Sequence, residues 1–115
     1  MNAPSTDPVL DRDVALSRVG GDLELLKEIA DLFLAEYPKV LEQLRAAACS
    51  GDPLALERAA HGLKGSVANF GASGAVEAAR ILEAMGRAQK LDEVAHVIHT
   101  LELALASLAS ELAAL

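Results

Sequence analysis

Apolar residues recur every three or four positions along most of this chain, and this spacing constrains its fold more than any other feature. Near the C-terminal end the intervals alternate between four and three, at Val94, Ile98, Leu101, Leu105, Leu108 and Leu112. An earlier stripe has the same character, at Leu26, Ile29, Phe33, Tyr37, Val40 and Leu44. Such spacing puts the apolar side chains on one face of a helix, and that face has to be buried. Since no strand-like alternation is apparent, the pattern predicts an all-α fold.

Glycine, proline and aspartate residues divide the chain into five expected helices, at about 11–19, 22–49, 53–70, 73–85 and from 92 onward. Asp11, Asp22 and Ser73 stand where a side chain can cap the first N–H groups of a helix. Gly51-Asp52-Pro53 combines a residue suited to a left-handed position after a helix, an N-cap and a first-turn proline. Gly86 is expected to close the fourth helix.

The four longer segments are expected to pack together as one domain. Joined by short connections, they can form an antiparallel up-down four-helix bundle, with the short first helix covering one end. Pro38 lies inside the second helix and predicts a bend, because the apolar stripe continues through it. A chain of 115 residues suits a single domain, which we place at 11–115. Residues 1–10 lack the features of a secretory signal and are expected to be a disordered N-terminal tail.

Composition narrows the classes of partner. Because 52% of the residues are hydrophobic but only 3% aromatic, the core has to be mainly aliphatic. A formal net charge of −7 disfavours nucleic acid and anionic membrane surfaces. Cys49 is the single cysteine and cannot form an internal disulfide. The apolar stretch from Leu101 to Leu115 is interrupted by Glu102 and Glu111 and is too short to span a membrane, so we expect a cytoplasmic protein.

The third expected helix carries residues that suit chemistry better than packing. Its apolar stripe consists of Leu56, Ala60, Leu63, Val67 and Phe70. A rotation of about 100° per residue puts His61 on the outward side of the helix, away from this stripe. Lys64 and Gly65, three and four positions later, lie beside His61 on the same surface.

His61, Lys64 and Gly65 together suit the transfer of a phosphoryl group. An exposed, unpaired imidazole is mostly neutral at neutral pH, and its free lone pair can attack phosphorus. Lys64 can lie against the phosphate oxygens, while Gly65 leaves open space through which a partner's active site can approach. Gly62 and Ser66 are interpreted as packing residues.

The segment from His61 to Ala72, His-Gly-Leu-Lys-Gly-Ser-Val-Ala-Asn-Phe-Gly-Ala, resembles the signature of histidine-containing phosphotransfer (HPt) domains. The similarity extends to the long preceding helix, the Gly51-Asp52 turn and Leu82-Glu83, so it covers nearly the whole chain. It implies a four-helix bundle in which His61 accepts a phosphoryl group from the phospho-aspartate of a response-regulator receiver domain and passes it to another receiver. It also implies that Lys64 steadies the phosphate and that Gly65 gives the receiver access.

The resemblance further implies response-regulator receiver domains and a sensor or hybrid histidine kinase as partners. The Mg²⁺ that this chemistry needs is expected in the receiver's acidic pocket, so no cofactor or metal is expected in this chain. We expect a monomeric carrier and not an ATP-dependent kinase, because the sequence has no Gly-rich phosphate loop and no room for a nucleotide domain.

A docking surface for the receiver is expected around His61 and on neighbouring parts of the second helix. Its candidate residues are Leu54, Glu57, Arg58, Ala68 and Asn69. Leu54 and Ala68 would form its apolar centre, and no chemical role for Asn69 follows from the sequence. Phe33 and Tyr37 are interpreted as core residues.

Two other functions stay open from the sequence. The chain could be the HPt domain of a hybrid or chemotaxis-type kinase, or a helical scaffold that binds a signalling partner without carrying phosphate. A metal site is disfavoured. His96 follows Glu93 in a Glu-x-x-His pattern of the kind found in di-iron bundles, but no second pattern of this kind is present. His96 and His99 also point away from the apolar seam of their helix.

Overall fold

Five helices make up the regular structure of residues 9–115, which are the residues that the computed structural model describes. They are α1 (Arg12–Arg18), α2 (Leu23–Ser50), α3 (Pro53–Ala68), α4 (Ser73–Ala88) and α5 (Val94–Ala113). The all-α class expected from the sequence is therefore confirmed. None of these helices has the length and the apolar character of a membrane span.

Aspartate caps open the first three helices where the sequence predicts them. The carboxylates of Asp11, Asp22 and Asp52 each accept a hydrogen bond from the backbone N–H three residues later, at 3.2, 3.1 and 3.1 Å. Each such cap contributes about 1 kcal/mol. Gly51 ends α2 in the left-handed region with a φ of +65°. The turn between α2 and α3 is thereby fixed, and with it the residue at which α3 begins.

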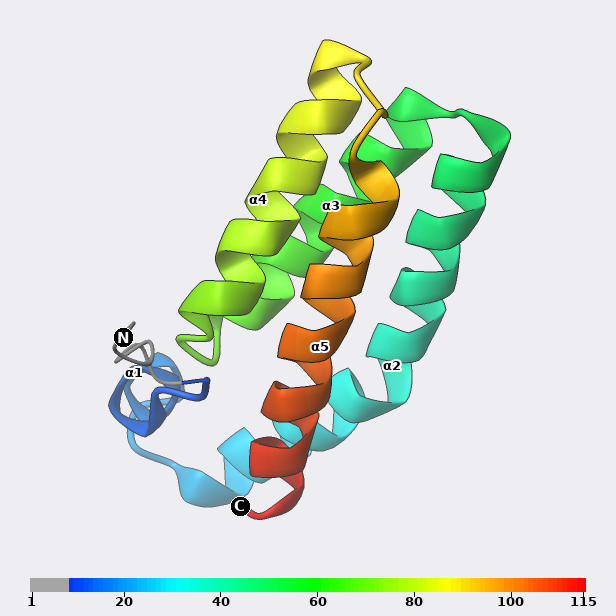
Figure 1. The fold of residues 1–115 in the computed structure, drawn as a ribbon. Coiled ribbons are helices and arrows are strands. Elements are labelled where there is room, and N and C mark those ends of the chain that lie inside the picture. Colours follow the sequence, from blue (N-terminus) through cyan, green and yellow to red (C-terminus); the bar gives the residue numbers. More distant parts are fainter. Residues whose placement is uncertain (1–8) are drawn as a thin grey trace, which may run out of the picture.

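Helices α2 to α5 pack around one core. α3 packs against α2 and α4, and α5 packs against α4 and α2 (Figure 1). Successive helices of this group run in alternating directions along the molecule (Figure 1). The predicted apolar stripes of α3 and α5 are buried at every position. With one face of α3 committed to the core, the opposite face is left to solvent.

α2 runs unbroken through Pro38. Figure 1 shows this helix changing direction in its cyan part, which agrees with the bend that the proline predicts. Three residues of its predicted stripe are buried and three are partly buried against the core: Leu26, Phe33 and Leu44, then Ile29, Tyr37 and Val40. The bend lets one long helix follow the core from end to end.

Two expectations about α4 are wrong. Ser73 is the first residue of the helix, and the capping position belongs to Ala72, which is buried and makes no side-chain cap. Gly86 does not close α4, which continues to Ala88 before Gln89 turns left-handed at a φ of +57°. Gly86 is instead buried within the helix. A Cβ there would lie 2.7 Å from two backbone atoms of α3, Glu57 N and Pro53 O, so the close approach of α3 and α4 requires a glycine.

The N-terminal tail expected at residues 1–10 lies outside the described residues as far as residue 8. Leu10 is buried in the core cluster. Asp11 N donates a hydrogen bond of 2.9 Å to Phe70 O, just beyond α3. The segment that leads into α1 is thus attached to the end of the helix that carries His61.

Candidate functional site

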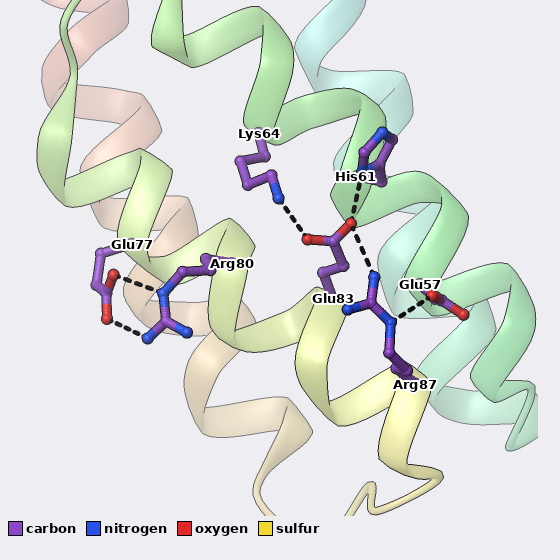
Figure 2. A network of polar contacts seen from close by, with 7 residues as sticks. All are labelled: Glu57, His61, Lys64, Glu77, Arg80, Glu83 and Arg87. Carbon is purple, nitrogen blue, oxygen red and sulfur yellow. Dashed lines mark hydrogen bonds and ion pairs between the residues drawn. The ribbon is translucent and has the colours of Figure 1, made fainter.

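His61 projects from the outward face of α3, and 70% of its side chain is exposed. The helix turns its buried stripe toward the core at Leu56, Ala60, Leu63 and Val67, so the residues between them face away from it. Figure 2 shows His61 and Lys64 on the same side of α3, both turned toward α4. The outward position predicted for His61 is confirmed.

A buried carboxylate from α4 joins the two residues. Glu83 keeps only 6% of its side chain exposed, and its Oε2 lies 2.5 Å from His61 Nδ1. Its other oxygen, Oε1, accepts a hydrogen bond of 2.6 Å from Lys64 Nζ. The sequence led us to expect an unpaired imidazole, and this expectation is wrong. One of its two nitrogens is held by Glu83 (Figure 2).

The charge of Glu83 determines which nitrogen of His61 can react. The hydrogen bond from Lys64, followed by the one with His61, lowers the pKa of the Glu83 carboxyl below its usual value despite the opposing effect of burial. An ionised carboxylate only accepts hydrogen bonds, so Nδ1 must carry the proton and donate it. In the neutral ring the free lone pair is then on Nε2, the nitrogen that is not hydrogen-bonded to Glu83.

Arg87, one turn after Glu83 on α4, borders the same site. Its Nη2 lies 3.6 Å from Glu83 Oε2, while its Nε donates a hydrogen bond of 3.0 Å to Glu57 Oε2 on α3. Together with Leu54, Arg58 and His61, these three residues line an open hollow between α3 and α4. The site thus combines a nucleophilic ring, a buried anion and several cations.

The two glycines that follow His61 on α3, Gly62 and Gly65, have open space around them. A Cβ added at Gly62 or at Gly65 would meet no atom within 4 Å, and both positions are exposed. The interpretation of Gly62 as a packing residue is therefore wrong. Ser66 is exposed as well, and its hydroxyl donates 3.2 Å to Gly62 O within the helix. At Gly62 and Gly65 the surface of α3 next to His61 therefore carries no side chain.

Comparison with known proteins places this site in a family. The sequence pattern that defines the Hpt domain matches residues 28–112, which include α3, α4 and most of α2 and α5. The chain belongs to the Hpt domain family. This confirms the resemblance drawn from the segment at His61–Ala72 and the phosphotransfer role in a phosphorelay that it implies.

A solved structure agrees with this membership. The crystal structure of histidine-containing phosphotransfer protein B (HptB) from Pseudomonas aeruginosa PAO1 superimposes with a TM-score of 0.85 at 28% sequence identity, over 94% of this chain and 93% of that one. No curated protein matches the chain. Hpt domains work with receiver domains and histidine kinases as phosphotransfer intermediates, and this is the class of protein to which the chain belongs.

The docking residues expected from the sequence lie on two sides of His61 and Gly65. Leu54, Glu57 and Arg58 border the hollow next to Glu83 and Arg87. Asn69 lies on the other side, in a groove between α2 and α3 whose walls also include Ile29, Leu32, Glu36 and Ser66. Ala68 is partly buried in the last turn of α3. His61 and Gly65 occupy the ridge between these two hollows.

Phe33 packs as a core residue should, with its ring centroid 5.3 Å from that of Phe70 and 5.4 Å from that of Tyr37. The two histidines considered for a metal site, His96 and His99, are exposed on α5. Within residues 9–115, no three His, Cys, Asp or Glu side chains are placed to share a metal ion.

Sequence reasoning gave no chemical role to Glu83 or Arg87. One signal was present, because Glu83 interrupts the buried face of α4 between Ala79 and Gly86. A carboxylate on an apolar stripe needs a partner. The identity of that partner could not be read from the chain, since 22 positions separate Glu83 from His61 and only the packing of α4 on α3 brings them together.

Replacing Glu83 with glutamine tests the charge at this position. Because the folded-state pKa of Glu83 lies below its unfolded value, its contribution to stability is present above the ordinary glutamate pKa and disappears as the pH falls through the folded value. We expect Glu83→Gln to lower the free energy of unfolding by about 1–2 kcal/mol at pH 7. In urea titrations this difference should shrink as the pH falls below the ordinary glutamate pKa. Glu42, an exposed carboxylate on α2, provides the control variant Glu42→Gln. A loss for Glu83→Gln that does not change with pH would contradict the expectation.

Proposed function

We propose that this protein carries a phosphoryl group on His61 Nε2, taking it from the phospho-aspartate of one receiver domain and passing it to another receiver. The observation that carries the proposal is the pairing of an exposed imidazole with a buried, ionised Glu83 through Nδ1. This pairing leaves the nucleophilic lone pair on the free nitrogen of an exposed ring. A scaffold that only bound a partner would have no need for it.

The proposed transfer exchanges one bond for another. The lone pair of Nε2 attacks the phosphorus in line, and an N–P bond forms as the aspartyl O–P bond breaks. The electron pair of the broken bond stays with the receiver's carboxylate. The proton stays on Nδ1, so the ring becomes a phosphoimidazolium whose positive charge faces Glu83. In the onward step the ring leaves as neutral imidazole, which makes the transfer reversible.

Lys64 and Gly65 keep the roles that the family motif implies for them. Lys64 Nζ is already held in the site by Glu83 Oε1 at 2.6 Å, one helical turn from His61. From there its ammonium can pair with an oxygen of the phosphoryl group. Gly65 presents backbone without a side chain, so a receiver can bring its aspartate close to Nε2.

The scaffold proposed for this function is a single domain at 11–115, an antiparallel up-down four-helix bundle with a short additional N-terminal helix. The protein acts as a monomeric relay intermediate without ATP-dependent kinase activity of its own. The Mg²⁺ required for transfer is held by the receiver. An HPt domain inside a hybrid or chemotaxis-type kinase would use the same site, with a different donor.

We place the receiver's docking surface on the ridge at His61 and Gly65 and on the groove between α2 and α3 that Asn69 borders. Leu32 in this groove is 67% exposed, and an apolar side chain so exposed gains free energy when a partner covers it. Leu54, Glu57, Arg58 and Ala68 complete the surface around the ridge. A patch of this kind supports a transient complex, which a carrier needs in order to change partners.

The function is tested by incubating the purified protein with a panel of receiver domains labelled at their aspartates. We expect at least one receiver to transfer label to this chain, and the label to be acid-labile and alkali-stable as phosphohistidine is. A second, unlabelled receiver should then remove it. If no receiver in the panel labels the wild-type chain, the proposed function is wrong.

Access at Gly65 can be tested separately from stability. Gly65→Leu adds a side chain whose Cβ would meet no atom within 4 Å, so the helix should gain about 0.5–1 kcal/mol while transfer from a receiver slows at least about tenfold. Gly74→Leu is the matched control, since Gly74 is exposed with open space around it and lies more than two turns along α4 from Glu83. Equal transfer rates for both variants would show that Gly65 does not provide access.

A further inference from the structure

The guanidinium of Arg87, which borders the site, makes few contacts with other residues. Its side chain makes one hydrogen bond within residues 9–115, from Nε to Glu57 Oε2 at 3.0 Å, and is 67% exposed. Its Nη2 approaches Glu83 Oε2 at 3.6 Å, which is an ion pair but not a hydrogen bond. Most of the five N–H donors of this guanidinium therefore remain available to another acceptor.

A second arginine on α4, Arg80, forms a complete two-point interaction with a carboxylate. Arg80 donates from Nε and from Nη2 to the two oxygens of Glu77, at 2.9 and 2.6 Å, in a two-point fork (Figure 2). The Arg87 side chain donates only one hydrogen bond to Glu57, from Nε. Because it is also exposed, its contact with Glu57 is of the weak kind that another anion can displace.

The distance from Arg87 to the reactive ring is short. Glu83 Oε2 lies 2.5 Å from His61 Nδ1 and 3.6 Å from Arg87 Nη2, so Arg87 is no farther from the imidazole than the sum of these two lengths. Figure 2 shows the guanidinium on the same side of Glu83 as His61. To reach a phosphoryl group on Nε2, which lies on the far side of the ring from Nδ1, the Arg87 side chain has to rearrange.

We propose that Glu57 and the phosphoryl group compete for Arg87. In the unphosphorylated protein Glu57 holds the guanidinium, and when His61 is phosphorylated Arg87 leaves Glu57 and pairs with the phosphoryl oxygens. Phosphorylation adds charge to a site that already contains the Glu83 anion, and a phosphoryl group offers three acceptor oxygens that match the arginine fork. This inference rests on the proposed function and deepens it, because it makes Arg87 a binding residue for the phosphoryl group and Glu57 a positioning residue that acts through Arg87.

The consequence of this competition is thermodynamic. Breaking the contact between Arg87 and Glu57 costs free energy, and this cost makes the phosphorylated form less stable. Glu57 therefore lowers, and Arg87 raises, the fraction of phosphoryl groups that reside on His61 at equilibrium with a given receiver. A carrier has to release its phosphoryl group to the next receiver, and a restraint on Arg87 keeps the phosphorylated form from becoming too stable to donate.

The test is the equilibrium ratio of phosphohistidine to receiver phospho-aspartate, measured with one receiver and with both proteins dilute. Docking accelerates forward and reverse transfer equally, so this ratio does not report on the docking surface, which also includes Glu57. We expect Glu57→Gln to raise the ratio about three- to tenfold and Arg87→Ala to lower it about tenfold. Arg87→Lys, which keeps the charge but not the fork, should recover part of the loss.

The double variant decides whether Glu57 acts through Arg87. With Arg87→Ala in place, Glu57→Gln should change the ratio less than about twofold, because the competition no longer exists. The pair Glu77→Gln and Arg80→Ala, an ion pair on α4 outside the site, should leave the ratio unchanged.

Two results would overturn the inference while the proposed function stands. One is a ratio of phosphohistidine to phospho-aspartate for the Glu57→Gln variant that equals the wild-type ratio. The other is an effect of Glu57→Gln that keeps its full size without Arg87, since Glu57 would then act only by its own charge. If the wild-type chain accepts no label from any receiver, the proposed function fails and this inference fails with it.

Discussion

His61→Gln is expected to abolish phosphoryl transfer to this chain while leaving its fold intact. Glutamine keeps a polar side chain near Glu83 but has no nitrogen lone pair that can attack phosphorus. The loss should therefore be complete within the sensitivity of a labelling assay, not a partial reduction in rate. Because 70% of the His61 side chain is exposed, the free energy of unfolding should change by less than about 0.5 kcal/mol beyond the loss of its contact with Glu83.

The other two histidines provide the control for this substitution. His96 and His99 are exposed on α5, as His61 is on α3. What sets His61 apart is its contact with the buried carboxylate of Glu83, which also binds Lys64. His96→Gln and His99→Gln should accept label from a receiver at the wild-type rate. If His61→Gln still becomes labelled, with the acid-labile and alkali-stable behaviour of phosphohistidine, then another residue carries the phosphoryl group and the assignment of His61 is wrong.

Features set by spacing within one helix could be predicted from the sequence. The stripes of α3 and α5 are buried as their periodicity requires, and the aspartate caps at Asp11, Asp22 and Asp52 form where the sequence places them. The outward direction of His61 follows from the same periodicity. Each of these depends on neighbours three or four residues apart, whose relation is fixed by helix geometry alone.

Features that depend on how two helices meet could not be predicted in this way. Glu83 reaches His61, and Arg87 reaches Glu57, only because α4 lies against α3 at one particular register. The same packing explains why a glycine stands at position 86, which we expected to be the end of a helix. A glycine that is needed for close packing and a glycine that ends a helix look alike in the sequence, and the distinction depends on the backbone of α3.

Gly86→Ala is therefore expected to be among the most destabilising small substitutions in this chain. The added Cβ would lie 2.7 Å from Pro53 O and from Glu57 N and 3.0 Å from Glu57 Cα, and backbone atoms inside a packed helix pair cannot move aside separately. The helices would have to separate, at a cost of about 1–3 kcal/mol. This outweighs the gain of about 1 kcal/mol that alanine brings to a helix interior.

Gly62→Ala provides the matched comparison, since it makes the same change inside a helix but in open space. It should raise the free energy of unfolding by about 0.5–1 kcal/mol, whereas Gly86→Ala should lower it, with both read from urea titrations of equal slope. Gly86 also stands between Glu83 and Arg87 on α4. A helix pushed away from α3 would carry both side chains away from His61, so Gly86→Ala should also slow transfer from a receiver under conditions where the variant is still folded. Stabilisation by both substitutions would mean that α3 and α4 are not held together as closely as the contact at Gly86 requires.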